Sequence, residues 1–310
     1  MKGLTRFMKG IELSFSFYNQ YKDFLVPEEY RLNVSAGLVG NGSECFGFDD
    51  DISKDHDFDA GFCLWLDDDL PSSVYDLISE RYASLPKEFL GVRRKANSNS
   101  KEKRKGVFYS SEFYKSLIGF TTAPKSPVEW LKIPDYALSS ATNGRVFTDN
   151  ATDFTYVRNK LINGVPNDVI LKRLSRALIL MAQAGQYNYI RCIKHGEEAA
   201  ARLALNEFVL NAAYCTYYLN GKFPPYYKWL LRGMVDFKLG ERISGLLSSL
   251  LLDTFYPECV DNIEKVSSMI LSELKARELT LGDELYLEPH AFRVAGRIKD
   301  EKIAKMHIME

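Results

Sequence analysis

The chain has 310 residues, of which 46% are hydrophobic and 26% charged, and its formal net charge at pH 7 is −1. This composition excludes a globally disordered chain, and the charge gives no general attraction to nucleic acid or to a membrane surface. A chain of this length can bury one large core or two modest ones, and we expect two. Its five cysteines show no CxxC spacing and have apolar neighbours, which fits reduced, buried thiols in the cytoplasm.

The N-terminal residues and the later apolar runs are too short or too interrupted for a signal peptide or a membrane span. We therefore expect a cytoplasmic protein with no membrane partner. Apolar residues recur at near-helical spacing over residues 4–25, and Val26-Pro27 ends this predicted helix.

A glycine turn follows the first predicted strand, which covers residues 32–39. The turn contains Gly40, Gly42 and Ser43. Its glycines leave backbone N–H groups accessible and Ser43 adds a hydroxyl, and such a turn suits a phosphate group.

A pair of carboxylates, Asp55 and Asp57, opens the second predicted strand, whose apolar run Phe62 to Leu66 indicates burial on both faces. Residues two apart on a strand point to the same face, so both carboxylates can reach one point, whereas His56 points away and is interpreted as a packing or supporting residue. Carboxylates this close repel unless a cation lies between them, and hard oxygen ligands suit Mg²⁺, with Mn²⁺ as an alternative. The pattern indicates phosphoryl or nucleotidyl transfer.

A cationic segment, RRKANSNSKEKRKG, extends from Arg93 to Gly106 and has no apolar anchor. It fits either a mobile arm that contacts phosphates or RNA, or a solvated loop. Residues 113–120 are predicted to form a short helix, whereas residues 130–138, which contain Pro134, are predicted to be connecting structure.

A third strand is predicted over Gly144 to Asp149. Asp149 closes it, and an acid at the end of a neighbouring strand would complete a three-carboxylate metal site with Asp55 and Asp57. The alternative is that Asp149 caps the turn that follows it.

Long helical patterns begin after Phe154, so we place the domain boundary between residues 151 and 152. The predicted helices cover residues 166–185, 187–219 (one helix or a pair), 226–236, 241–253, 258–278 and 289–305. The predicted fold is therefore α+β, with a β-sheet domain over residues 1–151 and an all-α helical bundle over residues 152–310.

The Gly-Ser turn, followed twelve residues later by Asp-x-Asp at a strand, resembles the polymerase-β-type nucleotidyltransferase superfamily. The segments GLVGNGSE, GFDDDISKDHDF, LPKEFLG, TNGRVFTD, QAGQYN and PPYYKW, in this order, resemble a bacterial nucleotidyltransferase-like family with a C-terminal domain of unknown function. This resemblance covers nearly the whole chain. It implies a small mixed β-sheet with Mg²⁺ on the Asp-x-Asp, and a helical bundle similar in plan to that of aminoglycoside nucleotidyltransferases, which move AMP from ATP to a hydroxyl.

On this resemblance, Gly42 and Ser43 would hold the triphosphate, and Asp55 and Asp57 would hold Mg²⁺, with Asp149 as the third acid.

The sequence departs from the family pattern at two positions. Arg145 stands where the family tends to have an acid, and Asp59 stands where glycine is common. The first departure, Arg145, counts against the assignment of Asp149 as the third carboxylate.

Nucleotidyl transfer also needs a cation for the pyrophosphate and a base for the acceptor hydroxyl. Lys228, within PPYYKW, is the candidate cation because it follows a rigid proline turn and has aromatic neighbours, and Arg232 lies one turn later on the same helix face. The alternative is that Tyr226, Tyr227 and Trp229 are core residues and that Lys228 merely extends past them to solvent.

Glu207 is the candidate base, because it lies in the apolar helical stretch from Leu203 to Ala213 and a buried carboxylate is a stronger proton acceptor. An ion pair with Arg202 or with a residue of another helix is the structural alternative. His195 is a second base candidate on spacing alone.

Residues 183–191, QAGQYNYIR, place amide and guanidinium groups between predicted helices. They fit either adenine or acceptor binding, or helix capping by Gly185 and Asn188.

The expected function is that of a Mg²⁺-dependent nucleotidyltransferase that moves a nucleoside monophosphate, AMP from ATP, to a hydroxyl of a small molecule. One alternative is nucleotidylation of a protein or a tRNA, supported only by the cationic segment. The other is a nucleotide-binding regulatory module without turnover, which the retained Gly-Ser turn and both acids disfavour.

Overall fold

The structure is a computed structural model that describes residues 8–52, 59–94, 103–252 and 256–310. The chain forms two compact units. The sheet unit comprises Met1–Pro124 and Ala137–Gly164, and the helical unit comprises Lys125–Tyr136 and Val165–Glu310. The predicted α+β class is confirmed, with a small mixed sheet and many helices.

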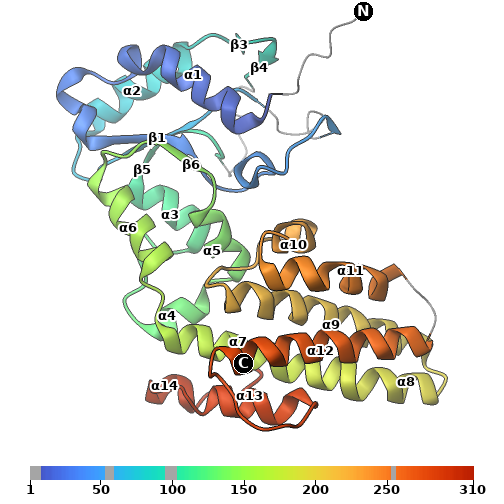
Figure 1. The fold of residues 1–310 in the computed structure, drawn as a ribbon. Coiled ribbons are helices and arrows are strands. Elements are labelled where there is room, and N and C mark those ends of the chain that lie inside the picture. Colours follow the sequence, from blue (N-terminus) through green and yellow to red (C-terminus); the bar gives the residue numbers. More distant parts are fainter. Residues whose placement is uncertain (1–7, 53–58, 95–102, 253–255) are drawn as a thin grey trace, which may run out of the picture. The chain divides into compact units, whose positions relative to one another are not determined.

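The sheet unit is built on a four-stranded sheet with the strand order β5-β2-β1-β6. Figure 1 labels β1, β5 and β6 of this sheet. Its strands are β1 (Val34–Leu38), β2 (Cys63–Leu66), β5 (Gly106–Tyr109) and β6 (Arg145–Thr148). β1 is antiparallel to both β2 and β6, whereas β5 is parallel to β2. The three predicted strands are present, but the second begins only at Cys63, since residues 59–62 are not strand, and it does not open at Asp55 and Asp57 as predicted. β5 has no counterpart among the predicted strands.

Helices cover both faces of this sheet, because β2 is apolar on both sides. On one face, α1 and α2 pack through Phe17 and Ile78 around Phe62. On the other face, the Trp65 ring stacks on Phe154 of α6 at 3.9 Å between ring centroids. The prediction that β2 is buried on both faces is therefore confirmed.

The helical elements of the sheet unit are α1 (Gly10–Leu25), η1 (Glu28–Asn33), η2 (Glu44–Phe46), α2 (Ser72–Ser84), α3 (Ser110–Ile118), most of α5 (Asp135–Thr142) and α6 (Thr152–Asn163). A small two-stranded sheet joins β3 (Glu88–Phe89) to β4 (Val92–Arg93).

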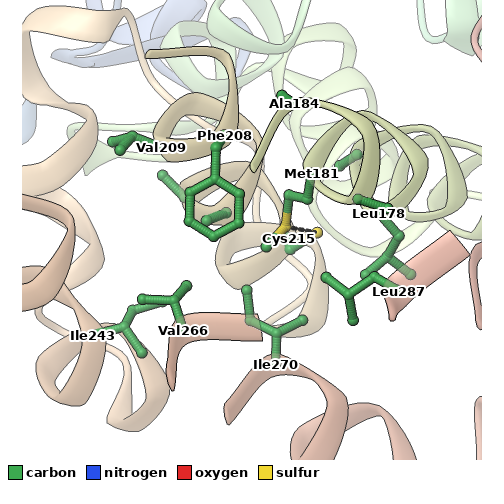
Figure 2. Packing of buried hydrophobic residues seen from close by; sticks show 14 of the residues in the cluster. Leu178, Met181, Ala184, Phe208, Val209, Cys215, Ile243, Val266, Ile270 and Leu287 are labelled. Atoms are coloured by element: carbon green, nitrogen blue, oxygen red, sulfur yellow. Dashed lines mark hydrogen bonds between the residues drawn. The ribbon is translucent and has the colours of Figure 1, made fainter. Parts of the chain in front are cut away.

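The helical unit is all-α, and its core lies between α7, α9, α11, α12 and α13 (Figure 2). Its elements are α4 (Pro127–Lys132), α7 (Asn167–Met181), the π-helix η4 (Ala182–Tyr189), α8 (Ile190–Lys194), α9 (Glu198–Leu219), α10 (Tyr227–Met234), α11 (Lys238–Leu252), α12 (Tyr256–Ala276), α13 (Leu287–Ala295) and α14 (Glu301–Ala304). None of the helices in the described ranges combines the length and the hydropathy needed to cross a membrane.

Two predictions about the helices are wrong. Residues 130–138 are not connecting structure, since α4 ends and α5 begins there, with Pro134 directly before the first residue of α5. Proline is favoured at helix starts, so here it marks a beginning and not an interruption. The helix expected over residues 289–305 is divided into α13 and α14.

The two units divide the chain differently from the predicted boundary between residues 151 and 152. α6 belongs to the sheet unit, because Phe154 stacks on Trp65. Residues 125–136 belong to the helical unit, because Asp135 forms an ion pair with Arg173 and accepts a hydrogen bond from Tyr218.

Candidate nucleotide-binding edge of the sheet

The Gly-Ser turn lies at the C-terminal end of β1. Gly37, near that end, pairs with Cys63, the first residue of the antiparallel β2. The chain segment that leads into β2 therefore reaches the same sheet edge as the turn. Asp55, His56 and Asp57 lie in that segment, but they fall outside the described residues.

The turn is held by residues of the loop between α5 and β6. Asn143 contacts both backbone groups of Gly40: the Gly40 N–H donates to Asn143 Oδ1 at 3.0 Å, and Asn143 Nδ2 donates to the Gly40 carbonyl at 2.9 Å. The N–H of Gly144 donates to the carbonyl of Cys45 at 2.9 Å. These three hydrogen bonds fix the path of the turn on both sides of Gly42.

Two independent constraints require a glycine at position 144. Its φ of +69° lies in the left-handed region, and a Cβ at this position would lie 1.9 Å from the Leu38 carbonyl oxygen. Left-handed backbone and overpacking each cost about 1–3 kcal/mol for a residue with a side chain.

The Gly144→Ala variant should therefore lose about 3 kcal/mol of unfolding free energy, measured by urea denaturation. Gly119→Ala is the matched control, since Gly119 has a φ of +78° and a Cβ there would meet nothing within 4 Å. That variant should lose only about 1 kcal/mol, the cost of the backbone conformation alone. Equal losses in both variants would show that the approach to Leu38 does not matter.

Gly42 and Ser43 form the part of the turn predicted to hold a triphosphate. Gly42 is buried with φ +152°, and a Cβ there would lie 2.5 Å from Glu44 Oε2. The Ser43 carbonyl accepts hydrogen bonds from the N–H groups of Phe46 at 3.1 Å and Phe48 at 2.8 Å, so η2 closes the turn directly after Ser43. Ser43 itself is half-buried.

A buried ion cluster lies beside this turn and has no counterpart in the sequence-based site. Lys105 Nζ is 2.6 Å from Asp59 Oδ1 and 3.4 Å from Glu44 Oε1, and all three side chains are at most 13% exposed. Burial alone would lower the pKa of Lys105, but the carboxylates of Asp59 and Glu44 outweigh it and hold that pKa above its usual range. Asp59 is one of the two positions at which the sequence departs from the family pattern, and Lys105 is its buried counter-ion.

The described ends of the cationic segment contact the sheet unit, although Arg93, Lys103 and Arg104 are exposed. Arg94 donates to the carbonyls of Tyr82 at 3.0 Å and Leu85 at 2.9 Å, and its guanidinium lies 4.8 Å from the Tyr82 ring centroid. Lys103 donates to the Val107 carbonyl at 2.6 Å. Together with Lys105, these residues anchor both ends of the segment on the sheet unit.

Asp149 lies at the opposite edge of the sheet from the Gly-Ser turn. β6 is antiparallel to β1, and Thr148 pairs with Ala36, so the end of β6 is beside the start of β1. The next residue, Asn150, donates its N–H to Ser35 Oγ at 2.9 Å. The chain from Ser35 to Gly40 spans roughly 17 Å at about 3.4 Å per residue.

The Asp149 carboxylate accepts a hydrogen bond from the Thr155 hydroxyl in the first turn of α6. This contact matches the alternative interpretation, in which the Asp149 side chain caps the turn that follows it. The position of Asp149 does not support a shared ion with residues at the Gly-Ser edge. The residue of β6 that does lie at that edge is Arg145, which pairs with Leu38 and whose guanidinium lies 4.5 Å from the Phe15 ring centroid.

Lys228 and Arg232 are exposed on α10 of the helical unit. Tyr226 and Tyr227 are 48% and 71% exposed, so the alternative in which both are core residues is wrong. Their rings lie 4.4 Å apart, and Tyr136 approaches Tyr226 at 6.4 Å. The PPYYKW segment therefore presents aromatic faces next to a cation.

Glu207 is only half-buried on α9, so the burial on which its selection as a base depended is partial. Its carboxylate accepts a hydrogen bond from the buried Asn211 at 3.0 Å. Within the described residues it forms no ion pair, so the alternative partner Arg202 is not engaged either. His195 is exposed at the end of α8.

Residues 183–191 do not cap a helix, because η4 continues directly into α8. Gly185 is buried inside this π-helix. Gln186 instead connects helices: its amide donates to Glu264 Oε2 at 2.9 Å and accepts from the N–H of Leu287 at 2.9 Å. Tyr187 and Asn188 are exposed.

A family model described as a domain of unknown function (DUF4037) matches residues 130–230. This segment runs from α4 into α10, so it contains the Asn143-Gly144 loop as well as Glu207 and Lys228. No curated protein and no solved structure matches the chain.

Proposed function

We propose that the protein is a Mg²⁺-dependent nucleotidyltransferase that moves AMP from ATP to a hydroxyl group of a small molecule. The observation that carries the proposal is the glycine turn at the end of β1, clamped by Asn143 and Gly144 beside the start of β2. A rigid Gly-Ser turn is a phosphate cradle, and the Asp-x-Asp sequence leads into the neighbouring strand at the same edge.

The proposed metal ligands are Asp55 and Asp57, two carboxylates whose oxygen donors suit Mg²⁺. Elsewhere, among the residues that the structure describes, no group of three or more His, Cys, Asp or Glu side chains is arranged to hold a metal ion. When bound, Mg²⁺ would neutralise charge on the phosphate oxygens and orient the attacking and leaving oxygens. With Asp149 at the other edge, the proposal includes two protein carboxylates and no third.

In the proposed reaction, the acceptor oxygen forms a bond to the α-phosphorus while the bond from that phosphorus to the bridging oxygen breaks and pyrophosphate leaves. The backbone of Gly42 and Ser43 would bind the triphosphate. Lys228, with Arg232, would neutralise the pyrophosphate, and Glu207 would accept the hydroxyl proton. The exposure of Lys228 and the access of solvent to Glu207 are compatible with these roles.

A small-molecule acceptor is favoured over a polymer. The cationic segment was the only support for an RNA or protein acceptor, and its described ends are bound to the sheet unit through Arg94 and Lys105.

The proposal is tested by incubating the protein with α-labelled ATP, Mg²⁺ and a metabolite extract, and then separating small molecules, protein and RNA. Label in the small-molecule fraction, together with pyrophosphate release, is the expected result. Label in protein or RNA would move the acceptor to that class. Nucleotide binding without pyrophosphate release under any of these conditions would make the protein a binding module and exclude the proposed reaction.

A further inference from the structure

The helical unit contains a polar cavity of 180 Å³ between α7, α9 and the chain that precedes α5. Helix α7 contributes three cationic residues to its lining, Lys172, Arg173 and Arg176, and helix α9 contributes Tyr214 and Tyr218. All of these residues belong to the helical unit, whereas Gly42 and Ser43 belong to the sheet unit.

Only one of the three cations has a carboxylate partner among the described residues. Arg173 forms an ion pair with Asp135, whose second oxygen accepts a hydrogen bond from Tyr218 at 2.9 Å. Lys172 donates only to main-chain carbonyls, to His307 at 2.5 Å and to Met306 at 3.4 Å. Asp135 thus binds Arg173 and Tyr218, and within the described residues it forms no ion pair with Lys172 or Arg176.

Arg176 uses one of its five N–H donors in the described structure, since its Nε donates to the Met309 carbonyl at 2.8 Å. Tyr214 is another lining residue, and its hydroxyl makes no hydrogen bond within the described ranges. The cavity thus combines two cations without counter-ions, spare guanidinium donors and a hydroxyl donor.

A charge buried without a counter-ion is costly, and Lys172 is only 3% exposed. Burial lowers the pKa of Lys172, and the nearby Glu310 carboxylate opposes that effect. Glu310 also lines the cavity, but it is exposed, so its side chain can leave without unpacking any core residue. An external anion bound inside the cavity would neutralise the cations better than this exposed carboxylate.

We propose that the cavity binds a phosphate-type oxyanion, with Lys172 and Arg176 as its cationic ligands and the Tyr214 hydroxyl as a further donor. The source is either inorganic phosphate or the phosphoryl group of a small phosphorylated metabolite. A guanidinium fork and an ammonium group are the usual phosphate ligands, and two unpaired cations match a dianion. Glu310 then acts as a competing carboxylate at the same cations.

Titration calorimetry of the full chain with inorganic phosphate and with glycerol phosphate, in separate runs, tests the proposal. Arg176→Gln should weaken binding by about 10- to 100-fold, the effect of one charge-assisted hydrogen-bonding group. One control, Lys305→Gln, should bind as the wild type does, because it removes an 80% exposed lysine outside the cavity. Tighter binding of the ester would identify a phosphorylated metabolite as the source, and tighter binding of phosphate the free ion.

Glu310→Gln provides a test that does not depend on a buried residue. Removing a competing negative charge from an exposed position should tighten phosphate binding several-fold without changing the fold. Unchanged binding in Arg176→Gln, weaker binding in Glu310→Gln, or no saturable binding of either ligand to the wild type would each overturn the assignment.

Discussion

The Asp57→Ala variant should lose Mg²⁺-dependent nucleotidyl transfer by at least ~10³-fold, which corresponds to about 4 kcal/mol in the activation free energy. The reason is that one of the two proposed metal ligands is removed, so the charge that develops on the phosphates is no longer neutralised. The unfolding free energy should not fall, because the substitution relieves the repulsion between two carboxylates that stand two positions apart in the sequence. Transfer of label from ATP and urea denaturation measure the two quantities.

The matched control is Asp149→Ala, which removes the same group from the other end of the sheet. Because Asn150 binds Ser35 at the start of β1, this carboxylate lies far from the Gly-Ser turn. Asp149→Ala should keep transfer within about threefold of the wild type. A loss as large as that of Asp57→Ala would restore Asp149 as a ligand, and unchanged transfer in Asp57→Ala would contradict the proposed site.

The second large effect is expected from Lys105→Met, which should cost about 3–5 kcal/mol of unfolding free energy. Methionine fills a similar volume but leaves the carboxylates of Glu44 and Asp59 buried without their cation. Removing one member of a buried ion cluster costs more than the cluster contributes in total, because the remaining charges are uncompensated. Lys115→Met, on the exposed side of α3, is the control and should change stability by less than about 0.5 kcal/mol.

The raised pKa of Lys105 determines how the difference in unfolding free energy between the wild type and Lys105→Met depends on pH. A group whose pKa is raised by folding contributes its stabilisation fully below its unfolded value, about 10.4 for lysine, and loses it only as the pH rises through the folded value. The difference in unfolding free energy between wild type and Lys105→Met should therefore stay constant from about pH 7 to about pH 10. A difference that disappears within this range would show that Lys105 is not charged in the folded protein.

Local sequence patterns predict the centre of the sheet because burial there is continuous along the chain. The five residues from Phe62 to Leu66 are all 0% exposed, and a run of five apolar residues is a direct signal of a strand covered on both faces. β5 is harder to predict, because it has only four residues and directly follows a cationic run, so that no long apolar stretch marks the strand. The neighbouring Lys105 would be found only by noticing that a lysine stands directly before Gly106 and this apolar strand.

The buried ion cluster and the position of Asp149 depend on tertiary structure that local patterns do not encode. Lys105 and Asp59 are 46 positions apart, and their burial follows from the parallel pairing of β5 with β2. An acid at the end of a strand is predictable, but the sheet edge that it occupies depends on whether that strand is parallel or antiparallel to its neighbour. β6 is antiparallel to β1, which brings Arg145 and not Asp149 to the Gly-Ser edge.

The measurement that tests the proposed site most directly is a crystal structure with a non-hydrolysable ATP analogue and Mg²⁺. The expected result is a triphosphate on the backbone of Gly42 and Ser43, with the ion bound by Asp55 and Asp57 and no contact to Asp149. A nucleotide bound away from the Gly-Ser turn, or an ion held by residues other than this carboxylate pair, would contradict the proposal.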